Sequence, residues 1–191
     1  MNPCRATRAD LDRFAETYGT AMHGDPMIRW PLPDNTTIEA VVAMARPIVE
    51  MYLDVDAGWL VEDGLGVASW IPPSAAARFD ELEQPTRDAI APFTADGGIR
   101  YGQFWDWLAE HIPAEPCWML DLVAVQPSVQ GRGLGAALIN HGLALARSDG
   151  LPAFLETSQA HHVPYYECFG FHVIDEAAAP DAGPTIWFMR T

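Results

Sequence analysis

The chain has 191 residues and a net charge of −15 at pH 7, because 26 acidic residues outnumber 11 basic ones. All eleven basic residues are arginine; without lysine the chain cannot form a Walker A phosphate loop, a pyridoxal Schiff base or a protein-kinase small lobe. The acidic charge would repel a phosphate backbone, which argues against a nucleic-acid partner and favours a cationic one such as an amine.

The chain begins with signals for two helices. Residues 8–22 are expected to be helical, with Thr7 as the cap and Asp10 at the acidic position of a capping box. Residues 36–53 predict a second helix. We expect Pro47 to kink or divide it, because proline cannot donate the helical hydrogen bond.

A β-hairpin is the strongest local signal that follows. Asp63-Gly64 lies between two apolar runs, residues 58–62 and 66–71, and this dipeptide is typical of a tight turn between paired strands. The sequence therefore predicts a hairpin across residues 58–71.

The middle of the chain, residues 74–114, predicts helices that are interrupted at Pro85, at Pro92 and at a glycine pair. A proline within a helical pattern removes a donor and clashes with the preceding turn, so we expect a helix boundary near each.

The second half alternates strands and helices more regularly. Residues 118–125 form an apolar run of strand length, and residues 133–148 place Leu134, Leu138 and Leu145 on one helical stripe. Further strands are expected at 153–157, 171–174 and 185–189, with a short helix at 163–169. This irregular alternation predicts a mixed α/β fold with a mostly antiparallel sheet.

The segment Gln130-Gly131-Arg132-Gly133-Leu134-Gly135 follows a predicted strand and opens a predicted helix. A helix N-terminus offers unpaired N–H groups and partial positive charge, and glycines let a diphosphate approach the main chain closely. A Rossmann unit fits poorly, because Ala136 replaces the third glycine of that fingerprint and too few strands follow. A helix start that merely needs flexible residues is the alternative.

Three linked segments carry a family resemblance. They are Leu122-Val123-Ala124-Val125-Gln126-Pro127, the glycine loop, and Tyr166-Glu167-Cys168-Phe169-Gly170-Phe171. Together they resemble the GCN5-related N-acetyltransferases. The shared pattern, at these separations, is a V-x-P strand end, a Q/R-G-x-G-x-G/A loop and a Y-x-x-x-G-F helix exit.

Other segments look like those of the puromycin N-acetyltransferases within that family. The resemblance spans nearly the whole chain but is thinner between residues 20 and 110, where the family largely builds its acceptor pocket. The segments are Arg5–Asp10, Trp70–Ser74, Glu115–Trp118, Pro152–Ser158 and Pro164–Glu167.

The resemblance implies a single domain over residues 1–191, in which acetyl-CoA lies between two splayed central parallel strands. It places the pantetheine arm along the backbone of a bulged first strand, with one N–H polarising the thioester carbonyl, and it places the diphosphate on the glycine-loop amides. His162 stands where relatives often carry asparagine, which puts that contact in question. The implied cofactor-binding residues are Val123 (the N–H donor), Val125, Gln130, Gly131, Arg132, Gly133, Leu134, Gly135, Ala136 and His162.

The resemblance also implies direct attack of a neutral amine on the acetyl carbon, with two proton transfers. Tyr166 matches the family tyrosine that faces the CoA sulfur and is the expected general acid; packing against a helix end is its alternative role. Glu156 and Asp121 are the candidate bases, and each has a structural, hydrogen-bonded role as its alternative. Strict alternation along the strand would put Asp121 on the same side as Val123.

Aromatic residues are the candidates for the acceptor site. Phe104 and Trp105 lie in an aromatic-rich helix, and a wall of this kind beside acids suits a hydrophobic amine. Trp30 and Trp70 are further candidates. The alternative for all four is an ordinary place in the core.

The expected function is acetyl transfer from acetyl-CoA to a primary amine of a small molecule, with an antibiotic or aminonucleoside-like acceptor as one version. Protein or peptide acetylation and non-catalytic acyl-CoA binding are the alternatives. No metal site is expected, because the six histidines form no ligand pattern. Three widely spaced cysteines and no membrane or signal segment favour a cytoplasmic location, away from membranes. Both a monomer and a homodimer stay open.

Overall fold

The computed structural model describes residues 1–191. All seven strands of the chain belong to one sheet. Its strands lie in the order β1-β2-β3-β4-β5-β7-β6, and only β4 and β5 pair in parallel. The predicted mixed, mostly antiparallel sheet is confirmed. The strands are β1 Cys4–Arg5, β2 Gly58–Val61, β3 Gly66–Ile71, β4 Trp118–Val125, β5 Ala153–Thr157, β6 His172–Ala178 and β7 Thr185–Arg190.

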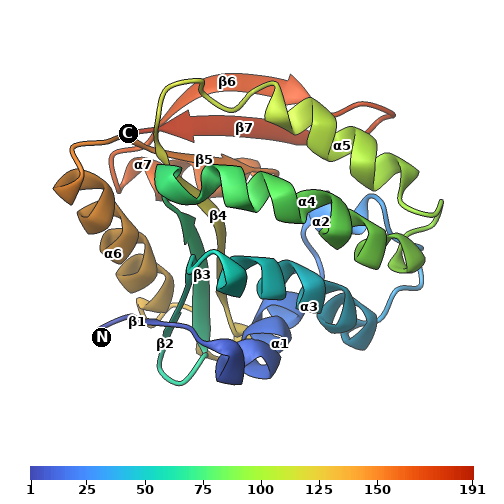
Figure 1. Cartoon of the computed structure of the whole chain (residues 1–191), viewed down its shortest axis with the longest axis horizontal. Helices are drawn as coiled ribbons and strands as arrows, with labels where there is room; N and C mark the ends of the chain where they lie inside the picture. The colour runs from blue at the N-terminus through green and yellow to red at the C-terminus, as the bar shows by residue number, and fades with distance from the viewer.

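Helices cover both faces of this sheet. They are α1 Leu11–Met22, α2 Pro26–Arg29, α3 Ile38–Asp54, α4 Ala76–Ile90, α5 Ile99–Ala109, α6 Leu134–Ser148 and α7 Val163–Glu167. In Figure 1, α6 lies on one side of β3 and β4, whereas α1 and α3 lie on the other side and α4 runs between α3 and α5. Separate apolar clusters fill the space under α6 and the space under α1 and α3.

Most local signals produce the predicted elements. The capping box forms, with the Asp10 carboxylate accepting the Thr7 N–H at 2.8 Å, and the hairpin turns at Asp63-Gly64. The helix boundary predicted near Pro92 is confirmed, because α4 ends at Ile90, but Pro47 does not divide α3 and Pro85 does not end α4. For α3, the tertiary packing of its apolar face outweighs one missing hydrogen bond.

A β-bulge and a parting of strands shape the centre of the sheet. Ser69 pairs with Leu122 and Trp70 pairs with Leu120, so Asp121 is an extra residue in β4. The parallel strands β4 and β5 pair at only two positions, Trp118 with Ala153 and Met119 with Phe154. Beyond these two pairs, β4 and β5 do not pair with each other, which confirms that the central strands are splayed.

Candidate active site

A cleft of about 720 Å³ begins where β4 and β5 part. Its walls come from the end of β4, the glycine loop with the start of α6, and the segment that leads into α7. The lining residues include Val123, Ala124, Val125, Gln130, Gly131, Gly133, Leu134, Gly135, Ala136, Gln159, His161, His162, Tyr165 and Tyr166. The cleft therefore brings together most of the predicted cofactor residues.

The edge of β4 that faces the cleft carries the backbone groups of Val123 and Val125. The N–H of Gln126 points the other way and donates to Leu65 in the hairpin at 2.9 Å. Because successive residues of a strand alternate between its two edges, the groups of Val125 and Val123 point into the gap. The Gln130 side chain agrees, since its amide donates to the Val125 carbonyl at 3.2 Å.

The glycine loop forms an anion site from main-chain atoms. Gly131 and Gly133 have φ of +78° and +84°, a conformation that only glycine adopts without strain. The first N–H of α6 with a backbone partner belongs to Ala137, which donates to Gly133 at 2.9 Å. The preceding amides are therefore available, at the positive end of a fifteen-residue helix.

Two side chains of this loop are engaged elsewhere in the structure. The Arg132 guanidinium is outside the cleft lining and pairs with Glu62 of the hairpin at 3.1 Å. The Leu134 side chain is buried in the core under α6, so only its backbone serves the cleft. A contact of the Arg132 side chain with the cofactor stays a prediction, and it would require the guanidinium to leave Glu62.

His162 lies just before α7 and Tyr166 lies within it, and their ring centroids are 6.2 Å apart with the rings nearly perpendicular. The Tyr166 ring is buried and lines the cleft. Burial, then Tyr165 and Glu156, raise the pKa of Tyr166, so its hydroxyl keeps the proton at neutral pH. Burial and His161 lower the pKa of His162, which favours a neutral imidazole.

The two candidate bases have different surroundings. Glu156 is buried on β5, and its Oε2 atom has no hydrogen-bond partner. Burial and the charge of Asp121 raise the pKa of Glu156 well above its ordinary value. Burial likewise raises the pKa of Asp121, although a hydrogen bond from the Tyr52 hydroxyl opposes this effect.

The bulge changes the side to which Asp121 points. Leu120 packs under α6 with Val123, whereas Leu122 packs under α1 and α3. Asp121 accepts its hydrogen bond from Tyr52 of α3, so it lies on the side of Leu122. The expected alternation, with Asp121 on the side of Val123, is therefore wrong.

An apolar pocket of about 50 Å³ lies on that side, between the helices α1, α2, α3, α4 and α5. Asp121 and Leu122 of β4 belong to its wall, and Met22 lines both this pocket and the cleft. The rest of the wall is Tyr18, Met27, Ile28, Ile48, Met51, Tyr52, Phe79, Glu83, Thr86, Arg87, Tyr101 and Trp105.

The four predicted acceptor residues have different places. Trp105 lines the apolar pocket, and Phe104 lines only a small adjoining cavity while packing mainly in the core. Trp30 borders a separate open groove. Trp70 is fully buried under α6, where its indole donates to the Leu138 carbonyl at 3.1 Å. The prediction for Trp70 is wrong, because the alternation of β3 turns it toward α6.

Sequence reasoning missed most of the pocket wall. Tyr18 and Tyr52 occupy the apolar stripes of α1 and α3, where any large residue is expected to be core. The one available signal was a hydroxyl within each stripe. This signal did not indicate that Tyr101, from a third helix, would line the same pocket as Tyr18 and Tyr52.

No group of three or more His, Cys, Asp or Glu side chains is placed to hold a metal ion. None of the helices has the length and apolar character needed to cross a bilayer.

Comparison with known proteins agrees with this geometry. The sequence model of the acetyltransferase (GNAT) family matches residues 72–171, and the chain belongs to this family. An uncharacterized N-acetyltransferase of Schizosaccharomyces pombe is 41% identical over 54 residues. That match covers 28% of this chain and 22% of the relative, so it spans about a fifth of the relative's length.

Solved structures share the fold at low sequence identity. A Corynebacterium glutamicum structure, described as histone acetyltransferase HPA2 and related acetyltransferase, has a TM-score of 0.66 and 22% identity, covering 99% of this chain and 94% of its own. The polyamine N-acetyltransferase of Drosophila melanogaster, which forms N-acetylagmatine, has a TM-score of 0.72 and 9% identity over 99% and 98%. A mosquito arylalkylamine N-acetyltransferase-like protein has a TM-score of 0.60 and 14% identity, again over 99% and 98%.

Proposed function

We propose that this acetyltransferase transfers the acetyl group of acetyl-CoA to the primary amine of a small molecule. The observation that carries the proposal is the junction of two cavities at β4. A cleft with free main-chain amides lies next to an apolar pocket that has a carboxylate in its wall, and Met22 lines both.

The cleft fits acetyl-CoA, which would supply an activated acetyl thioester when bound. Backbone amides from Gly131 to Ala136 would hold the diphosphate, because the α6 N-terminus leaves them unpaired. Gly135 keeps this surface open, since an added Cβ would lie 3.3 Å from the Tyr165 hydroxyl. The edge groups of Val123 and Val125 would bind the pantetheine arm, and the Val123 N–H would donate to the thioester carbonyl.

Tyr166 would act as the general acid. Its buried hydroxyl keeps its proton at neutral pH and lines the cleft, so it can protonate the departing thiolate. His162 would bind the cofactor in its neutral form and support the Tyr166 ring.

Glu156 is favoured over Asp121 as the base. Its Oε2 atom is unpartnered, and its raised pKa makes it a better proton acceptor than an ordinary carboxylate. Asp121 already accepts a hydrogen bond from Tyr52, which suits it to hold the ammonium of the incoming amine. The likeness to the puromycin N-acetyltransferases predicts an aminonucleoside-like acceptor within this class.

The test is thiol release from acetyl-CoA with a panel of amines that includes puromycin, simple alkylamines, polyamines and basic peptides. Turnover with small amines supports the proposal, whereas turnover with peptides alone or cofactor binding without any turnover contradicts it. In the same assay, Tyr166→Phe should lower kcat by about 100-fold while changing acetyl-CoA affinity less than threefold. Tyr165→Phe should cost far less, and an equal loss of kcat and affinity in Tyr166→Phe would refute the general-acid role.

A further inference from the structure

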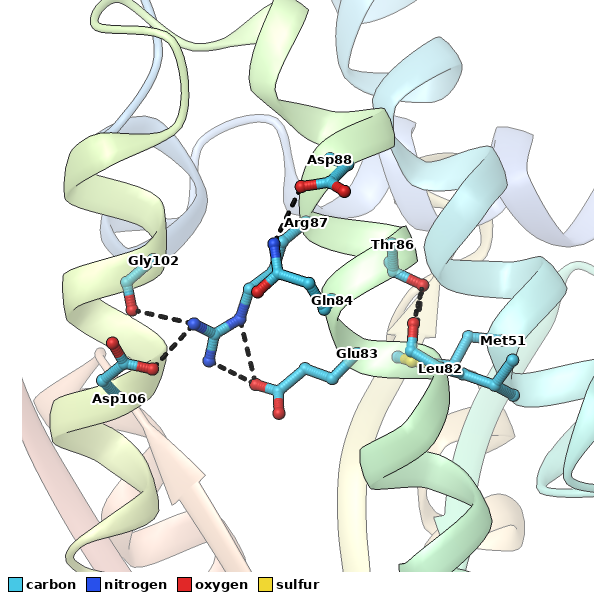
Figure 2. A network of polar contacts seen from close by, with 9 residues as sticks. All are labelled: Met51, Leu82, Glu83, Gln84, Thr86, Arg87, Asp88, Gly102 and Asp106. Atoms are coloured by element: carbon cyan, nitrogen blue, oxygen red, sulfur yellow. Dashed lines mark hydrogen bonds and ion pairs between the residues drawn. The ribbon is translucent and has the colours of Figure 1, made fainter.

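The end of the apolar pocket on α4 holds a partly buried cation that the acetyl-transfer chemistry does not use. Arg87 lines the pocket together with Glu83, and the Arg87 side chain is 16% exposed. Figure 2 shows its guanidinium between α4 and α5, with Glu83 on one side and Asp106 on the other. The pocket therefore has a carboxylate from Asp121 in one wall and, in another, a guanidinium that is paired with acids.

Every nitrogen of this guanidinium is engaged. The Nε and Nη2 atoms donate to Glu83, the former at 3.1 Å, and Nη1 donates to Asp106 at 2.7 Å and to the Gly102 carbonyl at 3.4 Å. Burial alone would lower the pKa of Arg87, but these carboxylates raise it above its ordinary value, so the charge persists. Glu83, the only other acid of the pocket wall besides Asp121, is already neutralised by this contact.

We propose that Arg87 restricts the acceptor to amines with a single positive charge and an apolar body. The inference rests on the proposed function and names its substrate class. An apolar chain fits a wall made mostly of methionine, isoleucine and aromatic side chains, and the methionines can adapt to its shape. A second ammonium in this pocket would lose its water and would find Glu83, the other acid of the wall, already paired with Arg87.

The sharpest probes are pentylamine and 1,4-diaminobutane, which have nearly the same length and differ by a terminal methyl group in place of an ammonium. We expect kcat/KM for pentylamine to exceed that for 1,4-diaminobutane by at least about tenfold. Calorimetric titration of each amine into the protein with coenzyme A gives the same comparison without turnover.

Two substitutions in the pocket wall should move this ratio in opposite directions. Arg87→Met keeps an apolar stem, removes the cation and leaves Glu83 unpaired, so the preference should shift about tenfold toward 1,4-diaminobutane. Glu83→Gln leaves Arg87 with a weaker counter-charge, so the preference for pentylamine should increase. Arg78→Met is the matched control on the same helix, because Arg78 is exposed, pairs with Glu81 and does not line the pocket. It should leave the ratio unchanged.

Each outcome separates this inference from the proposed function. Turnover of 1,4-diaminobutane as fast as pentylamine would overturn the inference and leave the acetyltransferase assignment standing. Selective binding of pentylamine without turnover of any amine would support the inference and contradict the proposed function. Binding of neither amine, or a folded Glu83→Gln variant with an unchanged ratio, would also overturn the inference. Thermal melting verifies folding of each variant.

Discussion

The cofactor cleft and the apolar pocket share β4 and Met22, yet they are built from different parts of the polypeptide. Apart from Ala21 and Met22 of α1, the residues of the cleft come from one stretch, from Val123 to Tyr166, which supplies its main-chain groups. The pocket uses side chains from five helices and a strand that span residues 18 to 122. A site made of backbone tolerates changes in most side chains, whereas a site made of side chains can change its specificity through single substitutions.

The two regions also differ in their electrostatics. The cleft offers partial positive charge from helix amides, which suits a diphosphate. The acceptor side has the carboxylate of Asp121 in its wall, and burial together with the charge of Asp121 raises the pKa of the neighbouring Glu156. The bulge at Asp121 produces this division, because it turns the Asp121 carboxylate away from the α6 side that Val123 faces.

The largest expected effect is on kcat and comes from a substitution of the candidate base. Glu156→Gln should lower kcat by about 100-fold or more, because the base is lost, while acetyl-CoA affinity stays within threefold. Calorimetry for the cofactor and steady-state kinetics for the amine measure both effects. Equal losses in the exposed control Glu167→Gln, or an unchanged kcat in Glu156→Gln, would contradict the assignment.

The same variant has a pH signature. The folded-state pKa of Glu156 is raised, so its contribution to stability is fully present below the ordinary value of 4.5 and is lost as pH rises through the folded-state pKa. Urea unfolding from pH 4 upward should therefore show a smaller loss of stability in Glu156→Gln than in the wild type. An identical pH dependence of stability in both proteins would show that ionising Glu156 costs the folded protein no free energy.

The sequence predicted the cleft far better than the pocket, for a physical reason. The glycines at 131 and 133 are required locally by positive φ, and the helix start at Leu134 follows from the same residues. Tyr18 and Arg87 acquire their roles only when distant helices pack together. Even within β4, one bulge reversed the expected side of Asp121, because alternation holds only without an extra residue.

Proline and tryptophan show the same limit. Pro47 favours an interruption of the helix, but the burial of α3 keeps that helix continuous. Trp70 reads as a possible ligand platform, but its indole fills the space over Gly142. In both cases a long-range contact decides an outcome that the local pattern leaves open.

A pair of glycine substitutions on α6 tests the backbone character of the cleft. Gly135→Ala adds a methyl group 3.3 Å from the Tyr165 hydroxyl and 3.6 Å from Val125, so KM for acetyl-CoA should rise about tenfold without loss of stability. Gly142→Ala is the structural counterpart, because its Cβ would lie 1.9 Å from the Trp70 ring. It should lower stability by about 1–3 kcal/mol and leave the KM of the folded protein unchanged. Thermal melting and kinetics together distinguish them, and equal effects on KM would refute the division.

The smallest expected effect concerns Arg132, the one cation of the glycine loop. Its guanidinium pairs with Glu62 and lies outside the cleft lining, so Arg132→Gln should change KM for acetyl-CoA less than threefold. Loss of this half-exposed ion pair should cost at most about 1 kcal/mol of stability. Glu62→Gln is the informative partner, because it removes the acid that holds Arg132. A tenfold rise of KM in Arg132→Gln would show that the arginine leaves Glu62 to bind the cofactor, and the cleft would then depend on a side chain after all.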